Sequence, residues 1–172
     1  MASLSLLSSA QPTDMSWSPG ITDLYQRYSE AVYGTALRVT GNPADAEDVL
    51  QTVFLRIIKQ GSRLDPALAP ERYLRRAASN AALDILRRRV AHPETPLGDM
   101  ARDTASKDPV LLKERLRRAI ATLQQRDAEL FLLRYVEGFS NGELAEWYGL
   151  EKNSVAVRLH RIRQTLQEEL ER

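Results

Sequence analysis

The side chains in this sequence that are best suited to chemistry are basic, and they gather in two clusters. Residues 152–163 contain no acid and four basic residues, which are Lys152, Arg158, Arg161 and Arg163. Residues 63–89 contain seven arginines and three acids. The net charge of the 172-residue chain is only +1, so both clusters stand out from a balanced background. Clustered positive charge is the usual electrostatic footprint of phosphate binding, and two clusters favour nucleic acid over the alternative of two ordinary solvated helix faces.

Other kinds of chemistry find little support in the residue types. The chain contains no cysteine, which excludes disulfides and cysteine-based zinc sites. His92 and His160 are far apart in sequence, so a histidine-based metal or catalytic cluster is not expected. No nucleophile–base pair, phosphate-binding loop or metal-ligand spacing stands out. We therefore predict a protein that is not an enzyme, with no catalytic residue, no metal and no cofactor.

A short acidic segment has a structural explanation. Asp45, Glu47 and Asp48 fall in the first turns of a predicted helix, where carboxylates are favoured by the helix dipole. A metal site or a paired-carboxylate catalyst would need converging partners from elsewhere in the chain, and none is evident. The same helix would expose an acidic and polar face that suits a protein partner, formed by Asp48, Gln51, Thr52 and Leu55.

The elements that carry these clusters are all predicted to be helices. Apolar residues recur at helical spacing, and no strand–turn–strand pattern is present. Gly41 ends the first helix, and Asn42 followed by Pro43 is a typical start for the second. The predicted fold class is therefore all-α. The expected helices cover residues 22–40, 43–60, 70–89, 110–123, 126–136, 141–148 and 153–170.

The helical periodicity disappears over residues 90–109, which predicts a domain boundary. This segment holds three of the eight prolines and four acids, a composition typical of linkers. We predict two small helical domains, residues 21–89 and 110–172, joined by this flexible linker and preceded by a disordered segment at residues 1–20. The first residues make a poor signal peptide, and no stretch reaches the ~18 apolar residues of a membrane helix. The sequence thus predicts a cytoplasmic protein without membrane insertion.

The C-terminal basic cluster lies in a predicted helix-turn-helix. Ala145 is small enough for a tight helix crossing, Gly149 tolerates the positive φ of a sharp turn, and Val155 can lock the second helix against the first. An ordinary helical hairpin is the less favoured alternative. At ~100° per residue, the inner stripe of the second helix consists of Val155, Leu159, Ile162 and Leu166. Arginines, amides, hydroxyls and a small apolar group on its other faces suit the phosphates and base edges of a DNA major groove.

The helix predicted over residues 70–89 carries the other basic cluster. Its inward residues are expected to be Tyr73, Leu74, Ala77, Ala78, Ala81, Ile85 and Leu86. Its mainly outward residues are expected to be Arg72, Arg75, Arg76, Asn80 and Arg87. Arginines with an aromatic residue and an amide suit nucleic-acid backbones and unstacked bases. From this segment alone, a solvated arginine face with a buried tyrosine is slightly favoured.

The order of these parts resembles one protein family. The segment NPADAEDVLQTVFLRI is similar to the polymerase-binding segment of the extracytoplasmic-function (ECF) branch of bacterial sigma-70 factors. The segment RYLRRAASNAALDILRRR is similar to the part of these proteins that meets the minus-ten promoter element. The sequence from LRRAIATL to HRIRQTL is similar to their C-terminal domain, which reads the minus-thirty-five element. Three segments in the right order, with a linker at the right place, make the resemblance specific over about residues 24–170.

The resemblance implies a function, partners and a set of binding residues. It implies a sigma factor that binds core RNA polymerase and promoter DNA and that is held inactive by an anti-sigma factor. The residues implied to form or support the polymerase-binding surface are Asp45, Asp48, Gln51, Phe54 and Leu55, with Phe54 mainly in the core. Those implied to meet the minus-ten element and its melted strand are Arg63, Tyr73, Arg75, Arg76, Asn80 and Arg87. Those implied to meet the minus-thirty-five element are Lys152, Asn153, Ser154, Val157, Arg158, His160 and Arg161.

Three positions depart from the family's pattern. Many members carry a basic residue directly after the valine of the promoter-reading helix and then a serine, whereas this chain has Ala156 and Val157. The preferred promoter sequence therefore cannot be carried over from the family. Tyr73 stands where tryptophan is commoner, which is a mild change.

Two non-enzymatic alternatives remain open from the sequence. A stand-alone helix-turn-helix regulator would explain the C-terminal domain but not the first one, and no dimerisation helix is evident. A sigma mimic that sequesters an anti-sigma factor would have no need of the arginine-rich third helix. An enzyme is the weakest interpretation.

Overall fold

The computed structural model describes residues 19–60, 70–92 and 108–172, and every regular element in these ranges is a helix. The helices are α1 (Pro19–Thr40), α2 (Pro43–Gln60), α3 (Pro70–Ala91), α4 (Pro109–Thr122), α5 (Gln125–Tyr135), α6 (Asn141–Tyr148) and α7 (Lys152–Glu171). The all-α prediction is confirmed, and the observed helix ends differ from the predicted ones by three residues or fewer. The predicted disordered segment included Pro19 and Gly20, which belong to α1, and most of the predicted linker lies outside the described residues.

The corner between α1 and α2 is made by the residues that the sequence marks as a helix stop and start. Gly41 has a φ of 67°, a left-handed conformation that glycine adopts without strain. The Asn42 side-chain oxygen accepts hydrogen bonds from the backbone amides of Ala44 at 2.9 Å and Asp45 at 3.3 Å. Pro43 occupies the first helical position, where a missing N–H removes no helical hydrogen bond.

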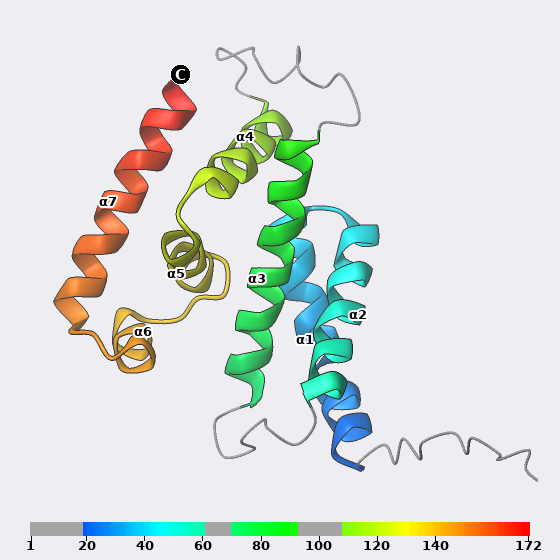
Figure 1. Cartoon of the computed structure of the whole chain (residues 1–172). Coiled ribbons are helices and arrows are strands. Elements are labelled where there is room, and N and C mark those ends of the chain that lie inside the picture. Colours follow the sequence, from blue (N-terminus) through cyan, green and yellow to red (C-terminus); the bar gives the residue numbers. More distant parts are fainter. Residues whose placement is uncertain (1–18, 61–69, 93–107) are drawn as a thin grey trace, which may run out of the picture.

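The central element of the molecule is α3 (Figure 1). It packs against α1 and α2 on one side and against α4 and α5 on the other. Most of the residues predicted to point inward are buried, and these are Leu74, Ala78, Ala81, Ile85 and Leu86. At ~100° per residue, Leu83 lies on the opposite side of the helix. Leu83 is nevertheless 0% exposed, because the C-terminal helices cover this second side.

One inward prediction for α3 is wrong. Tyr73 is 37% exposed, and its hydroxyl lies 3.5 Å from the side-chain oxygen of Gln60. The physical reason is the direction of the side chain around the helix. At ~100° per residue, the buried side chains of α3 point in directions that centre well away from that of Tyr73. Tyr73 therefore lies at the edge of the apolar stripe rather than within it.

Helices α4 to α7 enclose a core of their own. Asp108 caps α4 by accepting a hydrogen bond from the amide of Val110 at 2.8 Å. The largest fully buried side chains of this part are Leu132, Leu133, Leu144 and Val155. Because leucines from α5 and α6 meet the inner stripe of α7, the core fixes which face of α7 points outward.

The link between α6 and α7 is a helix-turn-helix turn. The Ser140 hydroxyl accepts from the amide of Glu143, and the Glu143 carboxylate accepts from the amide of Ser140, which together form a capping box at the start of α6. Gly149 has a φ of 63° at the end of α6, and the amide of Leu150 donates to the carbonyl of Ala145 at 2.8 Å. This arrangement ends α6 abruptly and redirects the chain into α7.

Within the described residues, no helix is long and apolar enough to cross a membrane.

The conformation of Gly149 leads to a stability prediction with an internal control. A Cβ at Gly149 would meet no atom within 4 Å, so Gly149→Ala adds only backbone strain, and we expect a loss of ~1 kcal/mol in unfolding free energy. Gly142 is helical, and a Cβ there would meet the Ser140 Oγ at 3.8 Å, an ordinary van der Waals contact, so Gly142→Ala should stabilise the protein by ~0.4–1 kcal/mol. Urea unfolding followed by circular dichroism measures both. Shifts of the same sign in the two variants would contradict this description of the turn.

Candidate nucleic-acid interface

The outward surface of α7 is polar and basic. Its predicted inner stripe is confirmed, since Val155, Leu159, Ile162 and Leu166 are all buried. The predicted DNA-facing residues that are exposed are Lys152, Asn153, Ser154, Val157, His160 and Arg161. Arg158 is half-buried. The fold thus presents one continuous surface of hydroxyl, amide, guanidinium and apolar groups, which we call the α7 face.

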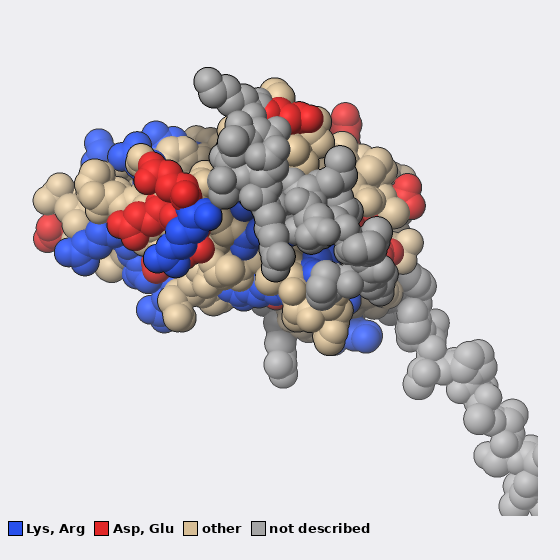
Figure 2. Space-filling model, turned by 90° about the horizontal axis from the view of Figure 1, so that it is seen from above, with Lys and Arg blue, Asp and Glu red and all other residues tan. Residues whose placement is uncertain are grey.

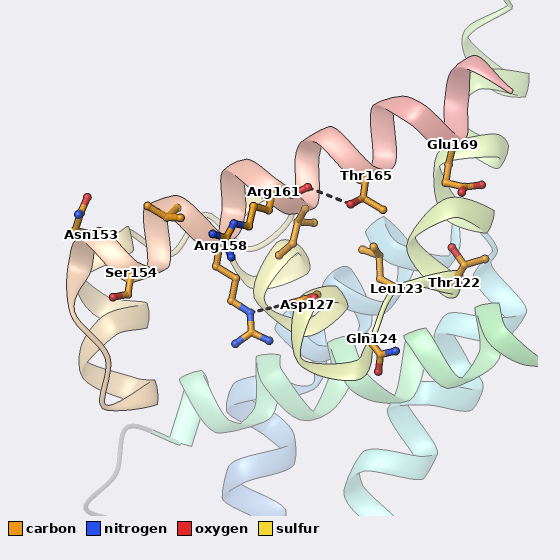
Figure 3. A pocket seen from close by; sticks show the side chains of 12 residues that line it. Thr122, Leu123, Gln124, Asp127, Asn153, Ser154, Arg158, Arg161, Thr165 and Glu169 are labelled. Atoms are coloured by element: carbon orange, nitrogen blue, oxygen red, sulfur yellow. Dashed lines mark hydrogen bonds and ion pairs between the residues drawn. The ribbon is translucent and has the colours of Figure 1, made fainter.

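A groove with a volume of about 960 Å³ runs along the α7 face (Figure 3). One wall comes from α7 and includes Asn153, Ser154, Val157, Arg158 and Arg161. The other wall comes from the end of α4 and the start of α5 and includes Thr122, Leu123, Gln124 and Asp127. The groove is therefore lined by donors and acceptors from two elements that the domain core holds in place.

Arg158 is positioned by a carboxylate across this groove. Its Nε lies 2.6 Å from the Asp127 Oδ1, and Figure 3 shows the side chain reaching from α7 to α5. Since this contact uses Nε, the two terminal nitrogens remain available to a further acceptor. The guanidinium of Arg161 forms no ion pair with any of the described residues. One arginine of the α7 face is therefore oriented in advance, and the other is not.

The arginine face of α3, by contrast, is turned toward the C-terminal domain. Arg75 Nη1 donates to Glu137 Oε2 at 2.8 Å, and Arg38 of α1 donates to Glu137 Oε1 at 2.8 Å. The Thr35 hydroxyl donates to the same carboxylate at 2.9 Å. The Glu137 side chain is fully buried by these contacts. The hydrogen bond to Glu137 outweighs burial and raises the pKa of Arg75 above its ordinary value.

A second buried carboxylate, Glu129, receives the next turn of α3. Arg76 Nε lies 2.8 Å from Glu129 Oε1, and Asn80 Nδ2 donates to Glu129 Oε2 at 2.6 Å. The Tyr148 hydroxyl donates to the same carboxylate, and burial followed by this hydrogen bond raises the pKa of Tyr148 above its usual range. The Arg76 guanidinium also lies 5.4 Å from the ring centroids of both Trp147 and Tyr148, which is within cation–π range.

Two more arginines bind helix ends across the same contact. Arg87 of α3 donates to the carbonyl of Leu123 at 2.9 Å and of Ala121 at 3.3 Å, at the C-terminal end of α4. Arg117 of α4 donates in the other direction, to the carbonyl of Val39 at 3.0 Å near the end of α1. Cations are favoured at helix C-termini, where carbonyl groups lack partners within the helix.

Arg72 completes the contact at the start of α3. Its Nη2 donates to Glu143 Oε1 at 2.9 Å. The hydrogen bonds from Ser140, with a smaller contribution from Arg72, lower the pKa of Glu143 below its ordinary value. The carboxylate that caps α6 thus also binds the N-terminal domain.

Three predicted residues lie away from this contact. Tyr73 is exposed beside the end of α2. Asp45 forms an ion pair with Arg89, which also donates to the carbonyl of Thr40 at 3.3 Å. Arg63 lies outside the described residues.

The predicted partner face of α2 is exposed. Asp48 and Gln51 are exposed, and Leu55 is 52% exposed although it is apolar. Phe54 is buried in the three-helix core, so it can support this face but not contact a partner directly. We call the surface of Asp48, Gln51 and Leu55 the α2 face. Within the described residues, no three or more potential ligands gather to hold a metal ion.

Comparison with known proteins agrees with this division into two helical parts. The family model for Sigma-70 region 2 matches residues 24–91, and the model for Sigma-70 region 4 matches residues 113–166. The chain is 31% identical over 151 residues to the RNA polymerase sigma factor CarQ of Myxococcus xanthus, covering 85% of this chain and 86% of CarQ. This chain belongs to the sigma-70 family.

Other relatives place this sigma factor in the ECF branch. It is 30% identical over 166 residues to the ECF RNA polymerase sigma factor SigE of Mycolicibacterium smegmatis, covering 91% of this chain but only 64% of SigE. A solved structure of the sigma factor RpoE in complex with the anti-sigma factor NepR, from Bartonella quintana, has a TM-score of 0.50. That match covers 88% of this chain and 96% of RpoE at 18% identity, so it supports the fold alone.

Sequence reasoning missed the acids of this sigma factor that face α3. Glu129, Glu137 and Glu143 were not singled out, although each contacts an arginine of α3. A signal was present for Glu129, since it lies one turn before the buried Leu133 and beside Leu130 on the apolar side of α5. An acid in such a position needs a cationic partner, because a lone buried carboxylate is strongly unfavourable. No local signal marks Glu137, which lies in the loop between α5 and α6.

The charges of this sigma factor do not form a single basic surface. Figure 2 shows lysines, arginines and acids interleaved at the end of the molecule on the α7 side. Electrostatic attraction to DNA therefore has to come from particular faces, not from the molecule as a whole.

The depressed pKa of Glu143 predicts a pH dependence. A carboxyl group with a lowered pKa stabilises the folded state above its unfolded pKa, and this contribution is lost as the pH falls through the folded value. Glu143→Gln can keep the cap but loses the charge, so it should be less stable than the unmodified protein at neutral pH. The two stabilities should converge below about pH 4. Urea unfolding at a series of pH values measures the difference in unfolding free energy between the two proteins. A difference that does not narrow as the pH falls would contradict a stabilising role for the charge of Glu143.

Proposed function

We propose that this protein is an ECF sigma factor that binds core RNA polymerase through the α2 face and directs it to promoters through the α7 face and α3. One observation carries the proposal: the same chain exposes two such faces, one on each domain. The helix-turn-helix domain exposes the α7 face, on which Arg158 is already oriented, and the region 2 domain exposes the α2 face. Membership in the family supports it. Polymerase would supply the chemistry, so this chain would act without a catalytic residue or cofactor of its own, in the cytoplasm where polymerase acts.

The α2 face has the properties of a protein-docking surface. Leu55 offers apolar area, Gln51 offers an amide one turn before it, and Asp48 offers an acid two turns before it. An exposed apolar side chain rimmed by polar groups is typical of interaction sites. Phe54, packed edge-on against Tyr25 with ring centroids 4.9 Å apart, keeps the helix seated in its domain.

The α7 face has the properties of a major-groove reader. Arginine can bind guanine edges or phosphates, Asn153 and Ser154 can bind other edges, and Val157 can contact a thymine methyl group. The helix is held by its buried stripe, so these side chains would enter the groove together. Asp127 would keep Arg158 extended toward the duplex.

The arginines and Asn80 of α3 would hold the melted strand of the minus-ten element, together with Tyr73. Guanidinium groups bind phosphates, and an exposed aromatic ring can stack on a base. We extend the partner set to an anti-sigma factor, because the structurally similar RpoE was solved in complex with one. A sigma mimic remains a second candidate, and only transcription separates it from a sigma factor.

The polymerase-binding role of the α2 face has a direct test. Asp48→Arg combined with Gln51→Ala should abolish co-elution with purified core RNA polymerase, since both side chains are exposed on that face and reversing a charge opposes a complementary surface. The matched control is Asp23→Arg with Gln26→Ala, which makes the same changes at the same spacing on the exposed side of α1. Equal binding by the two double variants, or no binding by the folded unmodified chain, would overturn the assignment.

The promoter-reading role of the α7 face is tested by two arginine variants. Arg161→Ala should weaken binding of the polymerase complex to a promoter duplex by about tenfold, as expected for one lost arginine contact to DNA. Arg163→Ala removes the same charge from the same helix but lies on the other side from the groove, so its effect should be clearly smaller. Fluorescence anisotropy with a labelled duplex measures both affinities. A larger effect from Arg163→Ala would mean that another side of α7 meets DNA.

A further inference from the structure

The face of α3 that we assign to promoter DNA is already occupied in this structure. We infer that the protein has a self-occluded state in which an acidic surface of its C-terminal domain, formed by Glu129, Glu137 and Glu143, covers the arginine face of α3. This inference rests on the proposed function, because that function assigns α3 to DNA. The partner of the acidic surface is therefore the other domain of the same chain.

The acidic surface binds α3 in the manner expected of phosphates. Each of the three glutamates accepts from a different arginine of α3, with nitrogen–oxygen distances of 2.8 to 2.9 Å. Carboxylate and phosphate oxygens make the same charge-assisted hydrogen bonds to guanidinium groups. Arg72 and Arg75 use terminal nitrogens for these contacts, so those nitrogens cannot also bind a nucleic-acid backbone. Arg76 uses Nε, and its guanidinium is covered by the rings of Trp147 and Tyr148.

Side chains beside these ion pairs are packed, which shows that the contact is more than a set of mobile surface charges. Leu83 lies on the arginine side of α3 and is 0% exposed. Helices α1 and α2 pack on the opposite side, so the C-terminal domain must cover it. Arg76 is also held against the rings of Trp147 and Tyr148, which occupy space beside its guanidinium that a base would need in order to stack on it.

The α7 face stays open while the α3 face is covered. Most of the α7 residues that line the groove are exposed, and α5 lies between α7 and α3 (Figure 1). In this state the protein can present its minus-thirty-five reader but not its minus-ten reader. Contact with both promoter elements then requires the two domains to separate.

The contact between the acidic surface and α3 has properties that allow the two domains to separate. The arginines that bind Glu137 and Glu129 remain 27% to 48% exposed, so their ion pairs are partly screened by water. Removing the carboxylates from water is unfavourable, and this penalty is regained when the domains separate. A polyanion that competes for the arginines can therefore shift the population toward the open state.

Glu137 offers the sharpest variant for a test. Its carboxylate forms hydrogen bonds with Arg38, Arg75 and Thr35, all in the N-terminal domain, and none with a described side chain of its own domain. Glu137→Lys should therefore repel the N-terminal domain without removing a contact that holds the C-terminal domain together. Glu168→Lys, at an exposed position near the end of α7, makes the same charge change as a control.

Arg38→Glu weakens the same contact by a substitution in the other domain. Arg38 is 48% exposed and lies outside the residues that we assign to DNA, so its substitution should be tolerated. The variant adds negative charge, which in general weakens DNA binding. Separation of the domains would instead tighten DNA binding, because it uncovers the arginines of α3. Arg27→Glu makes the same charge change at an exposed position on the same helix. Its oligonucleotide affinity therefore shows how much the added negative charge alone weakens binding.

Two measurements on the core-free, full-length chain test the inference. Spin labels on cysteines introduced at the exposed positions Glu47 and Gln164 report the distance between the domains, since the chain has no cysteine of its own. Anisotropy of a fluorescent single-stranded oligonucleotide of mixed sequence reports access to α3. Glu137→Lys and Arg38→Glu should lengthen the distance and tighten oligonucleotide binding, by up to about tenfold if one molecule in ten is open beforehand. The two controls should keep the short distance. Glu168→Lys should tighten binding much less than Glu137→Lys does, and Arg27→Glu should weaken it.

Three results would overturn the inference. The first is an unmodified chain whose spin-label distances already match those of Glu137→Lys and Arg38→Glu. The second is a lengthened distance with unchanged oligonucleotide affinity. The third is an Arg38→Glu variant that weakens binding as much as Arg27→Glu does. Failure of the proposed function would appear separately, as absence of core polymerase binding in the unmodified chain and in the opened variants alike.

Discussion

The structure depends on the burial of α3 on two opposite sides. One side closes the core of the N-terminal domain, and the other meets two carboxylates that are almost inaccessible to water. Burial of two carboxylates without partners would be strongly unfavourable, and α3 and α1 supply Arg76, Arg75 and Arg38 as partners. Burial of Leu83 on the same side of α3 contributes ~2 kcal/mol as an upper estimate. Any event that removes this helix from the C-terminal domain must hydrate both acids and expose that leucine.

This constraint divides the working surfaces of the sigma factor into two classes. The α2 and α7 faces point away from the contact and are exposed with their side chains in place. The α3 face is the one surface of the three that another part of the chain occupies. A protein arranged in this way can meet polymerase and a duplex with little rearrangement, whereas access to a melted strand is coupled to the relative position of its domains.

Much of the local structure could be predicted from the sequence, for identifiable physical reasons. Helical periodicity located all seven helices of the described residues, and the asparagine–proline start of α2 and the glycine stop at Gly149 marked helix ends that the structure contains. The inner stripe of α7 followed from its spacing and fixed which side chains face outward. These features depend on interactions between residues that are close in sequence.

The contact between the domains could not be predicted in the same way. Glu137 and Arg75 are separated by 62 residues, and nothing in the local pattern around Glu137 indicates a buried carboxylate. The arginines of α3 were correctly predicted to lie outside their own core, but the sequence offered only water or nucleic acid as their surroundings. Tyr73 was misplaced because a tyrosine at the edge of an apolar stripe satisfies the same periodicity as one within it.

The central claim is that this chain gives RNA polymerase promoter specificity, and run-off transcription tests it most directly. Purified core polymerase would be combined with the folded, inhibitor-free chain and a library of linear DNA fragments, and the 5′ ends of the transcripts would be sequenced. A sigma factor should give discrete start sites that depend on the chain and share two upstream elements. Polymerase that binds the chain but initiates at no such sites would contradict this claim and would favour a sigma mimic.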